Sequence, residues 1–157
     1  MEELTEAVQK VSLHTEIVSS KILYISLKFV RTSILNILRI FNLSEHDVQE
    51  QFHITLLYTG GKDNEHLVQL IPLFDNTYDI EINRIAISDK FVVLGVDWKD
   101  DIPYYGNETR HITIGKSNVI KQRLLPKDSP TAFTDGIVMT FDKPYLIKGI
   151  IEPVFKK

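Results

Sequence analysis

The sequence predicts an α+β fold whose strands pair mostly antiparallel. Apolar and polar residues alternate over residues 78–87, as they do in a strand with one buried face. An apolar stretch at 91–96 follows a Ser-Asp-Lys turn and completes a hairpin. Apolar residues at helical spacing in 32–41 and 65–74 add short amphipathic helices. Strands grouped into hairpins, with helices placed between them, are typical of the α+β class.

Length and composition fit one globular domain. The chain has 157 residues, enough to bury roughly 70% of the unfolded surface. We therefore predict a single domain over residues 1–157, with residues 1–20 as a peripheral N-terminal segment. The net charge is −3. Proteins that coat duplex nucleic acid are usually basic, so a nucleic-acid partner of this protein would be an end or a small piece.

Several classes of protein are excluded by what the sequence lacks. It contains no cysteine, which excludes a structural disulfide and a thiolate zinc site. No stretch reaches about 18 consecutive apolar residues, so no membrane-spanning helix is predicted. The N-terminus carries Glu2 and Glu3 and does not resemble a secretory signal. We expect a monomer in the cytoplasm, with the nucleus as an alternative, and no membrane partner.

The elements of the first half follow from periodicity and capping signals. A short helix is predicted near the N-terminus, a buried strand over 21–30, and a helix capped by Thr32 or Ser33 that runs to about Phe41. The run Ser44-Glu45-His46-Asp47 resembles a capping box and predicts a brief second helix. A buried strand follows at about 52–58.

The second half is predicted to be richer in strands. Pro72 shortens or bends the helix of residues 65–74, and a bulge near Arg84 explains the shift in apolar phase within the first hairpin strand. The remaining predictions are an acidic loop over 97–109, a strand over 110–115, a long loop over 116–134, and two final strands, 136–141 and 145–155, separated by Asp142-Lys143-Pro144.

Two of the predicted strands carry the same tripeptide, His-Ile-Thr. The first lies in Phe52–Tyr58 and the second in Arg110–Gly115. Residues i and i+2 of a strand lie on one face, so His53 projects with Thr55 and His111 projects with Thr113. If the two strands are neighbours, two imidazoles and two hydroxyls converge on one cleft.

Such a cleft suits the cleavage of a phosphodiester without a metal. Imidazole has a pKa near 6.5, so one ring can act as a general base while the other acts as a general acid. Threonine hydroxyls can donate hydrogen bonds to phosphate oxygens. Two other interpretations stay open. The histidines can be structural, or they can bind zinc with an acidic residue, although no HExxH or His-x-His pattern is present.

The paired motifs resemble those of the two-histidine (LigT-like) phosphoesterase superfamily. They are most similar to the cyclic phosphodiesterase domain of fungal tRNA ligases, whose motifs are of the types Phe-His-Val-Thr-Leu and His-Ile-Thr-Val-Gly. Here the matching segments are Phe52-His53-Ile54-Thr55-Leu56 and His111-Ile112-Thr113-Ile114-Gly115. Asn107 and Pro126-Lys127-Asp128-Ser129 also resemble the family pattern, and the resemblance covers about residues 21–155.

The resemblance implies a bilobal fold with two mostly antiparallel sheets, pseudo-two-fold symmetry and a central cleft. It further implies hydrolysis of 2′,3′-cyclic phosphate ends of RNA or nucleotides to 2′-phosphates, in RNA processing or repair, without a cofactor. His53 and His111 would be catalytic, while Thr55 and Thr113 would bind phosphate. Two alternatives remain: a phosphodiesterase acting on 2′-5′ oligoadenylate or another signalling oligonucleotide, and a non-catalytic nucleotide- or RNA-binding module.

Other residues near the motifs are candidate substrate contacts. Tyr58 can stack on a base or fill the core. Tyr104 and Tyr105 precede the second motif and can form a stacking wall, although exposed loop tyrosines are common. Lys116 directly follows the second motif, and Lys62 ends a Thr-Gly-Gly-Lys turn that lacks the spacing of a P-loop. Both lysines are candidate phosphate contacts, or ordinary solvated loop residues.

Overall fold

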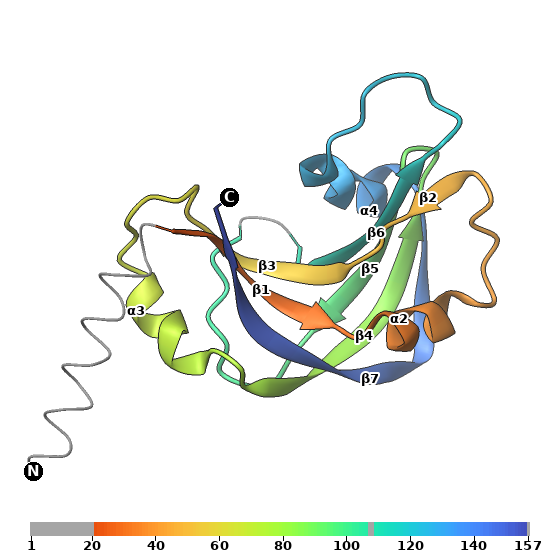
Figure 1. Cartoon of the computed structure of the whole chain (residues 1–157). Coiled ribbons are helices and arrows are strands. Elements are labelled where there is room, and N and C mark those ends of the chain that lie inside the picture. Colours follow the sequence, from red (N-terminus) through yellow and green to blue (C-terminus); the bar gives the residue numbers. More distant parts are fainter. Residues whose placement is uncertain (1–20, 107–108, 157) are drawn as a thin grey trace, which may run out of the picture.

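A computed structural model describes residues 21–106 and 109–156 of the chain. The strands are β1 (Ile22–Phe29), β2 (His46–Val48), β3 (Phe52–Tyr58), β4 (Thr77–Ile87), β5 (Phe91–Asp97), β6 (His111–Ser117) and β7 (Ile137–Phe155). The short helices are α2 (Arg31–Leu38), α3 (Leu67–Leu70), η1 (Ile71–Leu73), η2 (Pro126–Thr131) and α4 (Ala132–Asp135). The predicted N-terminal helix lies outside the described residues. Figure 1 shows a strongly curved sheet with the helices at its margins.

The α+β class and the antiparallel pairing are confirmed. The sheet has seven strands in the order β2-β6-β5-β4-β7-β1-β3, and every pair of neighbours is antiparallel. The prediction of two sheets is corrected, because hydrogen bonds connect all of these strands in one sheet. Strand β7 makes the connection, since it pairs with β4 on one side and with β1 on the other.

The two final strands predicted from the sequence are one strand of 19 residues. The register with β4 passes from Ile82↔Tyr145 to Arg84↔Thr140, so residues 141–144 of β7 lie opposite Asn83 alone. Asp142-Lys143-Pro144 therefore forms a bulge and not a hairpin turn, because both flanks continue to pair with β4 in the same direction. The predicted irregularity near Arg84 is confirmed at the same place.

Two helix predictions are wrong for identifiable reasons. Residues 46–48 form β2 and not a helix, because their backbone pairs with residues 115–117 of β6. Helix α2 begins at Arg31, with Val30 in extended conformation at its N-cap and no side-chain cap. The long loop predicted over 116–134 contains η2 and most of α4.

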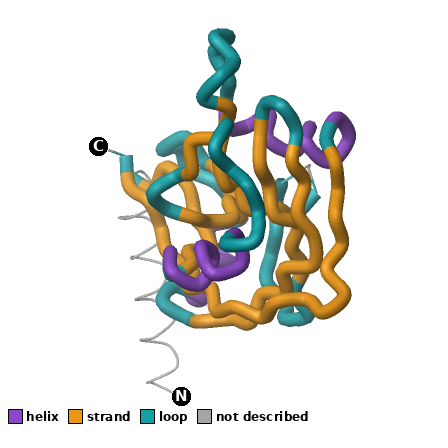
Figure 2. The backbone as a smooth tube through the Cα atoms, turned by 90° about the vertical axis from the view of Figure 1, so that its right-hand side faces the viewer, coloured by secondary structure: helices purple, strands orange, loops and turns teal. Residues whose placement is uncertain are grey.

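One main core connects the strands of the sheet to helix α2. It combines β-strand residues such as Ile54, Ile82 and Ile112 with Ile34 and Leu38 of α2. A second, smaller cluster joins Ala86, Phe91, Val93, Leu124 and Ala132, and it fastens the η2–α4 segment to β4 and β5. In Figure 2 the strands form the body of the molecule.

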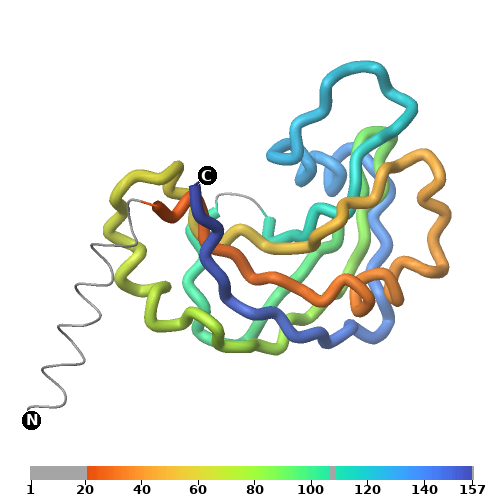
Figure 3. Tube along the Cα trace, viewed as in Figure 1, coloured from red at the N-terminus to blue at the C-terminus, as the bar shows by residue number. Residues whose placement is uncertain are grey.

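The curvature brings β3, at one end of the strand order, next to β6, near the other end. The backbone N–H of Gln49, just before β3, donates to the carbonyl oxygen of Ile114 in β6 at 2.8 Å. Figures 1 and 3 show β3 (yellow) and β6 (teal) side by side. The two strands that carry the His-Ile-Thr tripeptides are therefore neighbours in space, although they do not form a ladder with each other.

Candidate active site

A cleft of about 480 Å³ lies between β3 and β6. Both histidines and both threonines of the two motifs line it, together with Tyr58 from the end of β3. The remaining lining residues are Gln49, Ile54, Leu56, Leu57, Tyr104, Tyr105, Gly106, Pro126 and Lys127. None of the lining residues has a carboxylate, so the cleft is electrostatically suited to an anion.

The first motif reaches the cleft from the exposed face of β3. Phe52 and Ile54 are 1% exposed in the core, while His53 is half-buried and Thr55 is exposed. The register with β1 shifts at Leu56, which leaves Leu56 and Leu57 both buried. Because this bulge reverses the alternation, Tyr58 takes the same face as His53 and Thr55. Simple alternation would have placed Leu57 there and Tyr58 in the core.

Two hydrogen bonds fix the polar side chains of the second motif, His111 and Thr113. Nδ1 of His111 donates to the carbonyl oxygen of Thr109 at 2.7 Å, which leaves Nε2 free to exchange a proton. The Oγ1 of Thr113 lies 2.6 Å from the Oγ of Ser129 in η2. Ile112 and Ile114 point the other way and are fully buried.

The electrostatics of the cleft couple the two histidines. Burial lowers the pKa of His53 below its ordinary value of 6.5, and the charge on His111 lowers it further. His53 therefore resists protonation when His111 is already charged. As the pH falls below 6.5, the unfolded chain takes up a proton here more readily than the folded protein does. This site therefore lowers the free energy of unfolding in acid and has no effect at higher pH.

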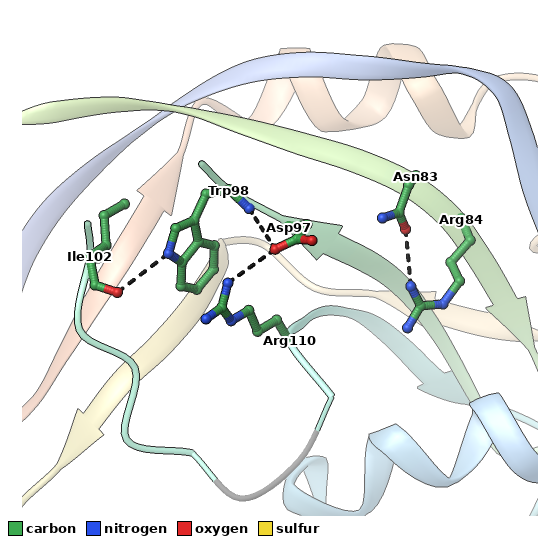
Figure 4. Close-up of polar contacts among 6 residues, drawn as sticks. All are labelled: Asn83, Arg84, Asp97, Trp98, Ile102 and Arg110. Carbon is green, nitrogen blue, oxygen red and sulfur yellow. Dashed lines mark hydrogen bonds and ion pairs between the residues drawn. The ribbon is translucent and has the colours of Figure 1, made fainter. Parts of the chain in front are cut away.

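The loop between β5 and β6 forms one wall of the cleft, and Figure 4 shows how its base is held. The indole N–H of Trp98 donates to the carbonyl oxygen of Ile102 at 3.3 Å. Arg110 donates to Asp97 at 3.0 Å, and its guanidinium lies 4.1 Å from the Trp98 ring centroid. These contacts fix the residue directly before His111.

Tyr104 and Tyr105 belong to this wall. The backbone N–H of Tyr105 donates to the carbonyl oxygen of Leu56 at 2.9 Å, which ties the loop to β3. The Tyr105 ring stacks on His66 with centroids 4.1 Å apart, and its hydroxyl bonds to Gln69. Tyr104 packs edge-on against Trp98. Tyr104 and Tyr105 therefore both line the cleft, as predicted, and the ring of each already packs against a neighbouring side chain.

The lysines are arranged differently from the prediction. Lys62 and Lys116 are not among the lining residues, and Lys116 pairs in register with Asp47 of β2. Lys127 of η2 is the one lysine in the lining. Lys116 was predicted because it is close to the motif in the chain, whereas Pro126 and Lys127 reach the cleft from the far end of the loop. Asn107 lies outside the described residues.

Among the described residues, no group of three or more histidine, aspartate or glutamate side chains could hold a metal ion. In the same ranges, no helix is long and apolar enough to span a membrane.

This chain is similar to known proteins at the level of the fold, as solved structures show. No protein family profile and no curated protein sequence match this chain. The fold is similar to the crystal structure of a fungal RNA kinase, with a TM-score of 0.61 and 16% sequence identity. The match covers 86% of this chain but only 46% of that one. At this level of identity the similarity shows a shared fold.

Proposed function

We propose that this protein is a phosphodiesterase that hydrolyses 2′,3′-cyclic phosphate ends of RNA or nucleotides to 2′-phosphates by acid–base catalysis, with no metal cofactor. The proposal rests on one observation: His53, Thr55, His111 and Thr113, from strands separated by more than fifty residues, line the same cleft. The family resemblance of the two motifs supports the reaction. The fold shared with an RNA kinase is in keeping with an RNA substrate.

The residues of the cleft supply each step of this reaction. The threonine hydroxyls donate hydrogen bonds to the non-bridging phosphate oxygens, whose charge grows in the transition state. One imidazole takes a proton from a water molecule as the water oxygen bonds to phosphorus. The bond between phosphorus and O3′ then breaks, and the other imidazole gives its proton to O3′. The product is a 2′-phosphate with a free 3′-hydroxyl.

The pH dependence of kcat/KM should be bell-shaped, with its acidic limb below pH 6.5. The reaction needs one neutral ring as the base and one protonated ring as the acid. Activity is therefore lost in acid, where both rings are protonated. That loss follows the lower of the two macroscopic pKa values, which the lowered pKa of His53 places below 6.5, whichever ring is the base. Initial rates with 2′,3′-cyclic AMP from pH 4.5 to about 9 measure the profile. A flat profile would contradict paired imidazoles.

Replacing Lys127 with methionine should raise KM for 2′,3′-cyclic AMP by about 3- to 10-fold. Added salt screens the charge of Lys127, so it should raise KM more for the wild-type protein than for the variant. The reason is that Lys127 is the lysine that lines the cleft and attracts the anionic substrate. Lys116→Met is the matched control, since Lys116 is exposed and lies outside the lining. Equal effects of the two substitutions would argue against a local role for Lys127.

The decisive experiment is to incubate the protein with 2′,3′-cyclic AMP in the presence of EDTA and to identify the product by ³¹P NMR. We expect adenosine 2′-monophosphate. Formation of the 3′-monophosphate would overturn the proposed bond cleavage, and loss of activity in EDTA would favour a metal site. Turnover of 2′-5′ oligoadenylate in preference to cyclic phosphate would identify a signalling oligonucleotide as the substrate. Binding of adenosine 2′-monophosphate without turnover would identify a binding module.

A further inference from the structure

Ser129 lies where it can control one of the two cleft threonines. It belongs to η2, sixteen positions after Thr113, and its side chain is fully buried. Its Oγ lies 2.6 Å from the Oγ1 of Thr113, a short distance for a hydrogen bond between two hydroxyls. Either oxygen can be the donor on distance alone.

Burial decides the direction of this hydrogen bond. In the described part of the structure, the Ser129 hydroxyl forms its hydrogen bond with Thr113. A buried hydroxyl hydrogen without an acceptor is costly, whereas an unused lone pair costs less. Ser129 therefore donates and Thr113 accepts. Since a hydroxyl has only one hydrogen, that of Thr113 is then directed away from Ser129 and is available on the cleft side.

Thr55 provides the contrast. It is exposed on β3, and its hydroxyl makes no hydrogen bond within the described residues, 21–106 and 109–156. Its hydroxyl is free to rotate until a ligand binds. The two motifs, which look equivalent in the sequence, therefore present one oriented donor and one unoriented donor.

We propose that Ser129 is a positioning residue that orients the Thr113 hydroxyl toward the phosphate oxygens of the substrate. This inference rests on the proposed function and extends it, because it makes Thr113 the pre-organised phosphate donor of the site. A hydroxyl that already points at the developing charge needs no reorientation during the reaction. The two hydroxyls in series also polarise each other, which strengthens the donor that faces the phosphate.

The position of η2 does not depend on the Ser129 hydroxyl. The carbonyl oxygens of Ser129 and Pro130 accept the backbone N–H of Ala132. Ala132 is fully buried and packs in the second cluster with Phe91 and Val93. Removal of the hydroxyl in Ser129→Ala should therefore leave η2 in place, which makes the substitution a clean probe of orientation.

The test is a pair of double-mutant cycles built on Ser129→Ala. Ser129→Ala is combined with Thr113→Val in one cycle and with Thr55→Val in the other. The measurements are kcat/KM with 2′,3′-cyclic AMP, the Kd for adenosine 2′-monophosphate by calorimetry, and the thermal unfolding temperature. We expect Ser129→Ala alone to lower kcat/KM by about tenfold, the scale of one hydrogen bond, and to weaken product binding. In the Thr113→Val background it should have little further effect, whereas in the Thr55→Val background the full loss should remain.

The two cycles separate a positioning role of Ser129 from a packing role. Equal losses in both backgrounds would show that Ser129 acts through general packing and would overturn the positioning role. Full activity of Ser129→Ala would overturn it directly. If the wild-type protein binds adenosine 2′-monophosphate without turnover, the proposed function fails, yet the same cycles in Kd still decide the role of Ser129. If the wild-type protein neither binds nor turns over these probes, both proposals fail.

Discussion

Replacing His111 with asparagine is expected to lower kcat for hydrolysis of 2′,3′-cyclic AMP by about 10²- to 10⁴-fold, and His53→Asn is expected to have an effect of the same order. Asparagine keeps much of the shape of imidazole but cannot exchange a proton near neutral pH. Both histidines are only half-buried at the cleft, so we expect little change in the free energy of unfolding. Steady-state rates and thermal unfolding of the single variants measure the two effects.

The two losses should not add. The two imidazoles carry out different proton transfers of the same reaction, and each depends on the other, so the double variant should be about as inactive as either single variant. An activated p-nitrophenyl phosphodiester, whose leaving group needs no proton, should restore turnover to the variant that lacks the acid and not to the one that lacks the base. This comparison assigns the two roles. If either single variant kept near-native turnover with the cyclic substrate, the acid–base pair would be wrong.

His46→Asn provides the matched control for these substitutions. His46 is a histidine of β2 that bonds to the carbonyl oxygen of Ser88 at 2.8 Å and lies outside the lining of the cleft. Its replacement should lower stability while kcat/KM stays near the wild-type value. The control therefore separates loss of a histidine from loss of a catalytic imidazole.

Gly115→Ala is expected to destabilise the protein by about 1–3 kcal/mol and to lower kcat/KM by about 10²-fold, although no side chain of the cleft is changed. A Cβ at Gly115 would collide with the carbonyl oxygen of Asp47 and lie 3.0 Å from its carbonyl carbon. Because these are backbone atoms of β2, they can move only if the strand moves. Strand β2 leads directly to Gln49, whose backbone N–H holds β3 against β6 through Ile114.

Gly95→Ala tests this explanation of the Gly115 effect. A Cβ at Gly95 would approach Arg84 atoms at 2.6–2.8 Å, but these belong to a side chain that can move aside. We expect a smaller loss of stability and activity than for Gly115→Ala. Chemical denaturation and kcat/KM of the two variants provide the comparison. If Gly115→Ala were as stable and active as the wild-type protein, the β2 tie would not be what brings the two motif strands together.

Several features of the fold could be read from local patterns alone. The hairpin of β4 and β5 was predictable because alternation and a turn signal coincide there. The break in helix near Pro72 followed from the missing backbone N–H of proline, and α3 indeed passes into η1 at that point. The errors occurred where long-range pairing overrides local preference. Residues 46–48 pair with β6, and Asp142-Lys143-Pro144 interrupts one strand without reversing it.

The sequence by itself determined which motif side chains share a face: the period of two within each strand puts His53 with Thr55 and His111 with Thr113. It also determined the antiparallel α+β class. Only the tertiary structure decided that the two strands meet, because the curvature of a sheet is set by the packing of the whole core. The same holds for the phase of Tyr58, which depends on a bulge defined by its partner strand β1. It holds as well for Lys127, which lines the cleft, and for Ser129, which contacts Thr113, because the loop that carries both is fastened to a second core.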